Sequence, residues 1–205
     1  MVTEHVAIIL TGLFTLISTV LAGWFAYNQK TKDRMTDLKI DQIKKESENK
    51  SAINNRHIAI IYGEMWDLVN KLEADRCFII QPHPELKYLY ISVVLEVDRK
   101  GISMAKDLVC NIPMNDIGNF SKELASNSWL YFDNIDGQVF DLRIRSLMRM
   151  AGSTNIAIRQ LANINNEWIG SIVVENTKQK PLSDDAREIM TNIANMIQFI
   201  LPPIN

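Results

Sequence analysis

The stretch NIAIRQLANINNEWIGSIVVENTKQKPLSDDAREIMTNIANMI, residues 155–197, sets the fold class of this 205-residue chain. Two apolar runs, residues 153–163 and 167–176, are joined by an Asn-Asn pair, and asparagine tolerates the positive φ that a tight hairpin turn requires. Ser183 then caps a helix whose first turn carries two aspartates, which suit the positive end of the helix dipole. The stretch therefore predicts a β-hairpin followed by a helix.

A longer strand is predicted upstream of this hairpin. Residues 88–97 alternate between an aliphatic face, which includes Ile91 and Val93, and a face that includes Tyr90 and Ser92. We expect the aliphatic face to pack against helices. The other predicted elements are a helix over 57–72, a strand over 76–81 ended by Pro82 and Pro84, mostly loop over 102–117, a short helix over 119–126, a short strand over 129–132 and a helix over 138–150.

This α-β-β-loop-β-β-α order resembles that of GAF domains, the ligand-sensing modules related to PAS. The resemblance is carried by EADRCFIIQPHPE (73–85), by IPMNDIGNFSKELASNSWLYFDNID (112–136) and by the closing hairpin and helix. It spans residues 57–201. It implies an α+β fold with a central antiparallel sheet, terminal helices on one face, and a ligand pocket on the other face beneath the loops of residues 102–135.

The same resemblance implies which positions would line the pocket. Each has a plainer interpretation, because aromatic side chains such as Trp129 and Tyr131 are more often part of a core than of a binding site. The candidates are Tyr90, Ser92, Cys110, Ile112, Asn115, Phe120, Trp129 and Tyr131.

The sequence lacks the ligand-binding and catalytic residues that define the better-known classes of GAF domain. The Asn-Lys-Phe-Asp-Glu constellation of cyclic-nucleotide-binding members is absent, and Cys110 has no histidine near it in sequence, as bilin-binding members require. A free methionine sulfoxide reductase needs a resolving cysteine, whereas position 118 is glycine and Cys77 falls in a predicted strand. The three histidines are too widely spaced for a metal site. We therefore expect no enzyme activity, no catalytic residues, no metal and no cofactor.

Other charged residues are expected to be solvated. Glu96 and Asp98 lie beside a predicted turn, and Arg143, Arg145 and Arg149 form a stripe on a predicted helix. Contact of this stripe with anionic lipid is an alternative. The net charge of −2 argues against nucleic-acid binding.

The amino-terminal region predicts a membrane anchor. Residues 6–27 carry no charge and would form a helix of roughly 33 Å, enough to span a bilayer. The tail of residues 1–5 has no lysine or arginine, whereas residues 28–47 have six, so the positive-inside rule places the amino end outside and the remainder in the cytoplasm at the inner membrane. One stripe of the anchor is made of small residues that favour helix association: Gly12, Thr15, Thr19, Ala22 and Ala26.

A charged helical stalk is predicted over residues 28–56, between the anchor and the GAF-like domain. It has i,i+4 ion pairs but no sustained heptad seam, so a solvated helix or a weak coiled-coil pair both fit. Residues 202–205 form a short tail. The apolar arc of the final helix is wider than one sheet contact needs, which favours a homodimer or higher homo-oligomer formed through the terminal helices and the anchor.

Two functions fit these features. The first is a single-pass membrane protein whose cytoplasmic GAF-like domain dimerises and either binds a small molecule or serves as a scaffold, with no output module in the chain. The alternative is a phage holin-like protein that permeabilises the membrane and has a regulatory cytoplasmic domain. Membrane potential after induced expression would separate the two hypotheses.

Overall fold

The computed structural model describes residues 24, 44–85 and 88–202. Residues 1–53 and 54–205 form two separate units. Within the described ranges, no helix combines the length and apolarity needed to cross a membrane. The predicted span, including its stripe of small residues, lies outside the described residues except for Trp24. Residues 44–53 of the predicted stalk are helical, and their side chains are exposed.

A six-stranded antiparallel sheet organises the second unit, and the strand order is β3-β2-β1-β6-β5-β4. The predicted antiparallel α+β architecture is confirmed. The strands are β1 (Arg76–Glu85), β2 (Tyr88–Asp98), β3 (Ile112–Pro113), β4 (Trp129–Phe132), β5 (Asn155–Ala162) and β6 (Trp168–Asn176).

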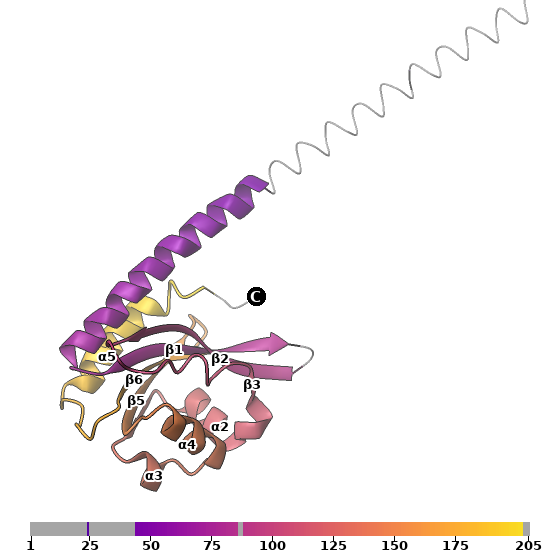
Figure 1. The fold of residues 1–205 in the computed structure, drawn as a ribbon. Coiled ribbons are helices and arrows are strands. Elements are labelled where there is room, and N and C mark those ends of the chain that lie inside the picture. Colours follow the sequence, from indigo (N-terminus) through magenta and orange to yellow (C-terminus); the bar gives the residue numbers. More distant parts are fainter. Residues whose placement is uncertain (1–23, 25–43, 86–87, 203–205) are drawn as a thin grey trace, which may run out of the picture. The chain divides into compact units, whose positions relative to one another are not determined.

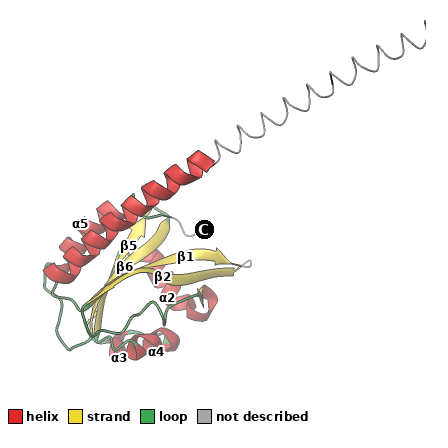
Figure 2. Cartoon of the chain, turned by 45° about the horizontal axis from the view of Figure 1, so that its top comes forward, coloured by secondary structure: helices red, strands yellow, loops and turns green. Residues whose placement is uncertain are grey.

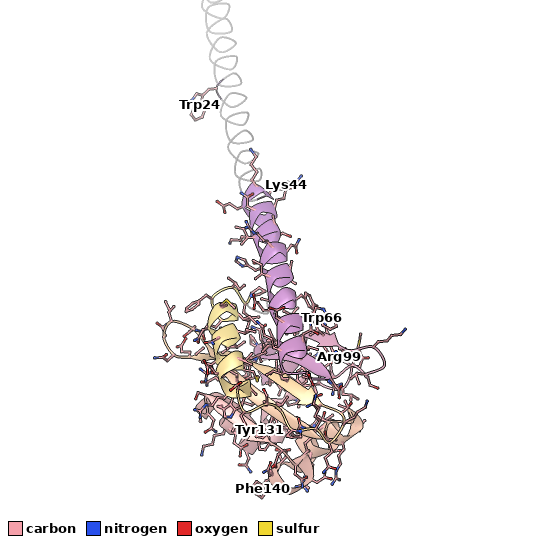
Figure 3. All side chains as sticks on the ribbon, turned by 90° about the vertical axis from the view of Figure 1, so that its left-hand side faces the viewer. Trp24, Lys44, Trp66, Arg99, Tyr131 and Phe140 are labelled. Carbon is pink, nitrogen blue, oxygen red and sulfur yellow. The ribbon has the colours of Figure 1, made fainter. Side chains whose placement is uncertain are left out.

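Helices cover both faces of the sheet (Figures 1 and 2). One face carries the part of the helix over residues 44–71 that belongs to the second unit, together with α5 (Ala186–Ile197). Arg99 fixes the end of that first helix by donating to the carbonyl oxygens of Ala74 (2.7 Å) and Val69 (3.1 Å) (Figure 3). The other face carries η1 (Met114–Ile117), α2 (Gly118–Ser126), α3 (Ile135–Gln138) and α4 (Leu142–Met150).

The sheet separates two apolar cores. The helix-side core contains the inward residues of the first helix and α5, packed on strand residues such as Cys77, Ile79 and Ile172. The loop-side core packs Phe78, Ile80 and other strand residues against η1, α2, α3 and α4. Because both faces of the sheet are buried, β1 and β6 have nearly continuous apolar sequences rather than alternating ones.

A bulge in β2 makes the predicted strict alternation of that strand wrong. Ile79 pairs with Leu95 but Ile80 pairs with Val93, so Val94 is an extra residue opposite β1. Leu95 therefore lies in the helix-side core, whereas Ile91 and Val93, which were expected to pack against the helices, lie in the loop-side core. Before the bulge the odd-numbered side chains of β2 face the loops, and after it the odd-numbered side chains face the helices.

Strand β1 continues through the two prolines that were expected to end it. It pairs with β6 only from Arg76 to Ile80, and beyond that point it pairs with β2 alone. Prolines two residues apart direct their missing N–H groups to the same edge of a strand. Pro82 and Pro84 therefore fit a segment with one unpaired edge.

The helix predicted over residues 138–150 begins only at Leu142, as α4, and the separate short helix α3 ends at Gln138. Asp141 sets the start of α4, because its carboxylate accepts from the N–H groups of Arg143 and Ile144, both at 3.1 Å. The predicted hairpin is confirmed: β5 and β6 pair directly, and Asn166 has a φ of 60° in the turn.

Candidate functional site

A small cavity of about 50 Å³ lies within the loop-side core. Its floor is the sheet, and its cover consists of α2, α4, the loop after β2 and the turn after α4. Ten of its wall residues are Phe78, Ile80, Ile91, Ile156, Ile158 and Val173 from the sheet, Phe120 from α2, and Ile144, Leu147 and Met148 from α4; the others are Ala105, Val109, Ala151, Ser153 and Glu175.

The wall of this cavity is almost entirely apolar. Only Ser153 and Glu175 among the wall residues have polar side chains, and both are buried. A cavity of this volume has room for very few water molecules. As it stands, the space therefore suits a small apolar occupant.

A buried ion cluster adjoins the cavity and is centred on Arg76, whose side chain is fully buried. The guanidinium donates to the Glu175 carboxylate and to the Ser153 hydroxyl (3.3 Å), and it lies 3.8 Å from the Glu96 carboxylate. The Ser153 hydroxyl in turn donates to the second oxygen of Glu175 at 2.8 Å. A buried charge with several partners of this kind costs much more to disrupt than a surface pair.

The cluster also ties the cover of the cavity to the sheet. Arg76 donates to the carbonyl oxygens of Ser103, in the loop after β2, and Ala151, in the turn after α4. Glu96 accepts from the backbone N–H groups of Ala105 (2.6 Å) and Lys106 (2.8 Å). Arg76 and Glu96, both on the sheet, thus hold the loop after β2 and the turn after α4 by hydrogen bonds.

Asp98 adds a third acidic group to the two that face Arg76. Burial, repulsion by Glu96 and a hydrogen bond with Glu96 together raise the pKa of Asp98 to about 7, although the charge of Arg76 opposes the shift. A carboxyl with this pKa holds a proton under mildly acidic conditions. The proton keeps the cluster from containing three negative charges.

The cluster was not predicted from the sequence, and the expectation that Glu96 and Asp98 are solvated is wrong. The Glu96 side chain is only 5% exposed, because the loop after β2 folds back over it. The available signal was a charged residue beside an apolar strand run, as in Arg76 of RCFII and Glu175 of SIVVEN. Buried charges of this kind are almost always paired.

Two of the eight pocket candidates belong to the loop-side core. Phe120 lines the cavity, and Ile112 is buried in the same core without reaching the cavity wall. Cys110 and Asn115 are exposed. Trp129 packs partly against the helix-side core, and Tyr131 is 38% exposed (Figure 3).

The remaining two candidates form a polar group away from the cavity. Ser92 lies 2.9 Å from Nε2 of His83 and accepts from the N–H of Asn111 at 2.8 Å. The ring of Tyr90 stacks on that of His83, with a centroid distance of 6.1 Å. The bulge explains this placement, because it turns Tyr90 and Ser92 away from the face that carries the cavity.

The two cysteines are not a redox pair. Cys77 is buried in the helix-side core, where burial raises the pKa of its thiol, whereas Cys110 is exposed. Neither lines the cavity. Within the described part of the chain, no group of histidine, cysteine and acidic residues could hold a metal ion. The predicted arginine stripe is largely paired, since Arg143 bonds Asp116 and Arg149 bonds Asp136.

Neither the family models nor the curated proteins match this chain. Among solved structures, the GAF domain of PixJ from Thermosynechococcus elongatus, in its blue-light-absorbing form, is similar with a TM-score of 0.58 and 12% identity over 73% of this chain and 89% of that one. A GAF domain from Synechocystis, in its photoproduct state, gives a TM-score of 0.56 and 14% identity over 68% and 89%.

A third similar structure is a domain from Sinorhizobium meliloti that is named for a two-component sensor histidine kinase, with a TM-score of 0.53 and 15% identity over 69% of this chain and 88% of that one. Sequence identities this low establish the fold alone. The sheet order, the helices on one face and the loop-covered cavity on the other therefore give residues 54–202 a GAF-like fold.

Proposed function

We propose that this chain is a membrane-anchored sensor whose GAF-like body binds a small molecule in the cavity of the loop-side core and acts as a homodimer. The observation that carries the proposal is the cavity itself, which lies between the sheet and a cover of loops and short helices. Concave, mainly apolar sites are the usual form of small-molecule pockets.

A covalently attached chromophore is not part of the proposal. Two of the similar structures are named for light-dependent states, but no thiol of this chain lines the cavity. A cavity of about 50 Å³ is also far smaller than the hundreds of Å³ typical of pockets for drug-sized ligands.

The cover of the cavity offers a route for the signal. Ala105 and Val109 of the loop after β2, and Leu147 and Met148 of α4, all contact the same space. An occupant that fits one arrangement of these segments better than another would shift the population toward that arrangement. The ion cluster around Arg76 would transmit the shift, because it bonds both cover segments and the sheet.

Homodimer formation is supported by apolar side chains exposed on the two helices that cover the other face. Ile60 and Trp66 of the first helix are 44% and 42% exposed; Trp66 is labelled in Figure 3. Met196 of α5 and Phe199 just after it are 50% and 67% exposed. These helices lie side by side on the sheet, so a second copy could pack against them as in a four-helix bundle.

Membrane anchoring remains a proposal that rests on the sequence of residues 6–27. It would place the GAF-like body at the cytoplasmic face of the inner membrane, attached through the charged stalk. If the full-length chain stays in the supernatant after ultracentrifugation of a detergent-free lysate, the anchor is wrong.

The test of small-molecule sensing uses the full-length chain in lipid nanodiscs and a thermal-shift screen of a metabolite library. We expect at least one compound to raise the melting temperature of the wild-type chain but not that of Ala105→Leu, which fills the cavity. Ala125→Leu, on the exposed surface of α2 and outside the cavity wall, is the matched control and should respond like the wild type. A compound that stabilises all three proteins equally, or no response at all, would overturn the proposal.

A further inference from the structure

We propose that the occupant of the cavity is a small, uncharged, mainly apolar molecule of about the size of one aromatic ring. This inference rests on the proposed function and specifies the class of ligand. It follows from the chemistry of the wall, from the state of the buried charges beside it and from the volume enclosed.

The wall offers contact surface but no free polar group. Thirteen of the fifteen wall residues are apolar. Both oxygens of the Glu175 carboxylate already have partners, Arg76 on one and Ser153 on the other. A ligand with a polar head would lose its hydration on entering and find no hydrogen-bond partner in return.

The cluster also disfavours ligands of either charge. Arg76 faces the carboxyls of Glu96, Asp98 and Glu175, so the cluster carries no spare positive charge for an anion. A cation could approach Glu175 only by replacing the guanidinium that already neutralises it. Replacement would leave Arg76 buried without its carboxylate, which is the costly way to break a buried pair.

Volume and shape favour one ring. A cavity of about 150 Å³ is known to bind benzene, so a cavity of about 50 Å³ requires the cover to move outward. Leu147 and Met148 on α4 are only half-buried, which leaves them room to move. The wall contains Phe78, Phe120 and the thioether of Met148, groups that make favourable contacts with aromatic rings.

The experiment compares toluene, benzoate and benzylammonium, which share a ring and differ in charge. The full-length chain is labelled with ¹³C at the methionine methyl groups, placed in nanodiscs and titrated with each probe, and Met148 is assigned with a Met148→Leu variant. Met196 of α5, on the other face of the sheet and 50% exposed, is the internal control for probe that merely partitions into lipid or coats the surface.

The expected result is a saturable shift of the Met148 methyl resonance with toluene, with neither charged probe producing one. If a charged probe shifts Met148 at lower concentration than toluene, the ligand class is wrong while small-molecule binding in the cavity stands. If no probe shifts Met148, or if Met148 and Met196 shift together, both this inference and the cavity as a binding site are wrong.

Two matched variants test the location. Ile158 and Ile135 are each 3% exposed in the loop-side core, but only Ile158 lines the cavity. Ile158→Val adds the space of one methylene, and we expect it to tighten toluene binding by about fourfold. Ile135→Val should leave the affinity unchanged. Equal effects from the two substitutions would contradict the assignment of the cavity.

Discussion

Replacing Arg76 by methionine should be among the most damaging single substitutions in the described part of the chain. The side chain is fully buried, and its guanidinium has partners in β2, in β6, in the loop after β2 and in the turn after α4. Its loss leaves the Glu175 carboxylate, itself 2% exposed, with only the Ser153 hydroxyl. Removing one member of a buried ion pair costs about 3–5 kcal/mol, a large share of the roughly 5–15 kcal/mol that stabilises a typical domain.

The assay is urea unfolding of the full-length chain, followed by tryptophan fluorescence, within a double-mutant cycle. Glu175→Gln removes the charge of the partner while retaining its shape. The double variant Arg76→Met/Glu175→Gln should be more stable than the sum of the single effects predicts, by about 1–3 kcal/mol, because it contains no unpaired charge at this position.

An exposed pair of the same chemistry is the control. Arg149 and Asp136 are bonded on the surface, with side chains 59% and 60% exposed. Arg149→Met should cost no more than about 1 kcal/mol, because solvent screens such pairs. If Arg76→Met costs as little as Arg149→Met, or if the effects at Arg76 and Glu175 simply add, the cluster does not hold the fold in the way argued above.

Two further predictions concern the proton at Asp98 and the tight packing of the sheet. Because the pKa of Asp98 is raised to about 7, the folded chain keeps a proton that the unfolded chain releases between about pH 4 and pH 7, so the free energy of unfolding falls as the pH rises through that window. Urea titrations between pH 4 and pH 7 should show a shallower fall for Asp98→Asn than for the wild type, and equal slopes would show that Asp98 does not hold this proton. Gly170→Ala should destabilise the chain by more than about 1 kcal/mol, because its Cβ atom would lie 2.7 Å from the carbonyl oxygen of Ile80. Gly63→Ala, in open space on the first helix, should be neutral or stabilising, and equal melting temperatures for the two variants would contradict the close contact at Gly170.

The sequence was sufficient to predict the elements whose pattern is local. The strand over residues 129–132, the hairpin with an asparagine at positive φ, and the helix after it are all present. The strand and the hairpin are set by alternation and turn chemistry within a few residues of themselves. The final helix begins at Ala186 with Asp185 as its N-cap and no side-chain cap hydrogen bond, so the predicted cap by Ser183 is wrong; the helix was predicted from its apolar periodicity. Such signals do not depend on what the rest of the chain does.

The bulge and the strand through the prolines could not be predicted in the same way. The extra residue in β2, Val94, becomes evident only from the register with β1, and no residue type marks it in sequence. Pro82 and Pro84 usually end a strand, and they are tolerated here because β6 stops pairing at Ile80. Both outcomes depend on neighbours that are distant in sequence.

The candidate site was predicted at the level of the sheet face and not at the level of residues. The loops of residues 102–135 do cover the cavity face, but Phe120 alone among the eight candidates lines the cavity. The charged cluster was missed because its members come from three strands and a turn. A buried arginine is indistinguishable from an exposed one until its partners are placed around it.

The two outer strands of the sheet have a consequence for how copies of this protein can meet. β3 is two residues long and β4 is four, and the part of β1 that lacks β6 as a neighbour carries two prolines. Few free backbone donors are therefore available to template another chain, which protects crowded copies from aggregating edge to edge. If copies associate as proposed, the contact depends on side chains of the helical layer, where its specificity can change one residue at a time.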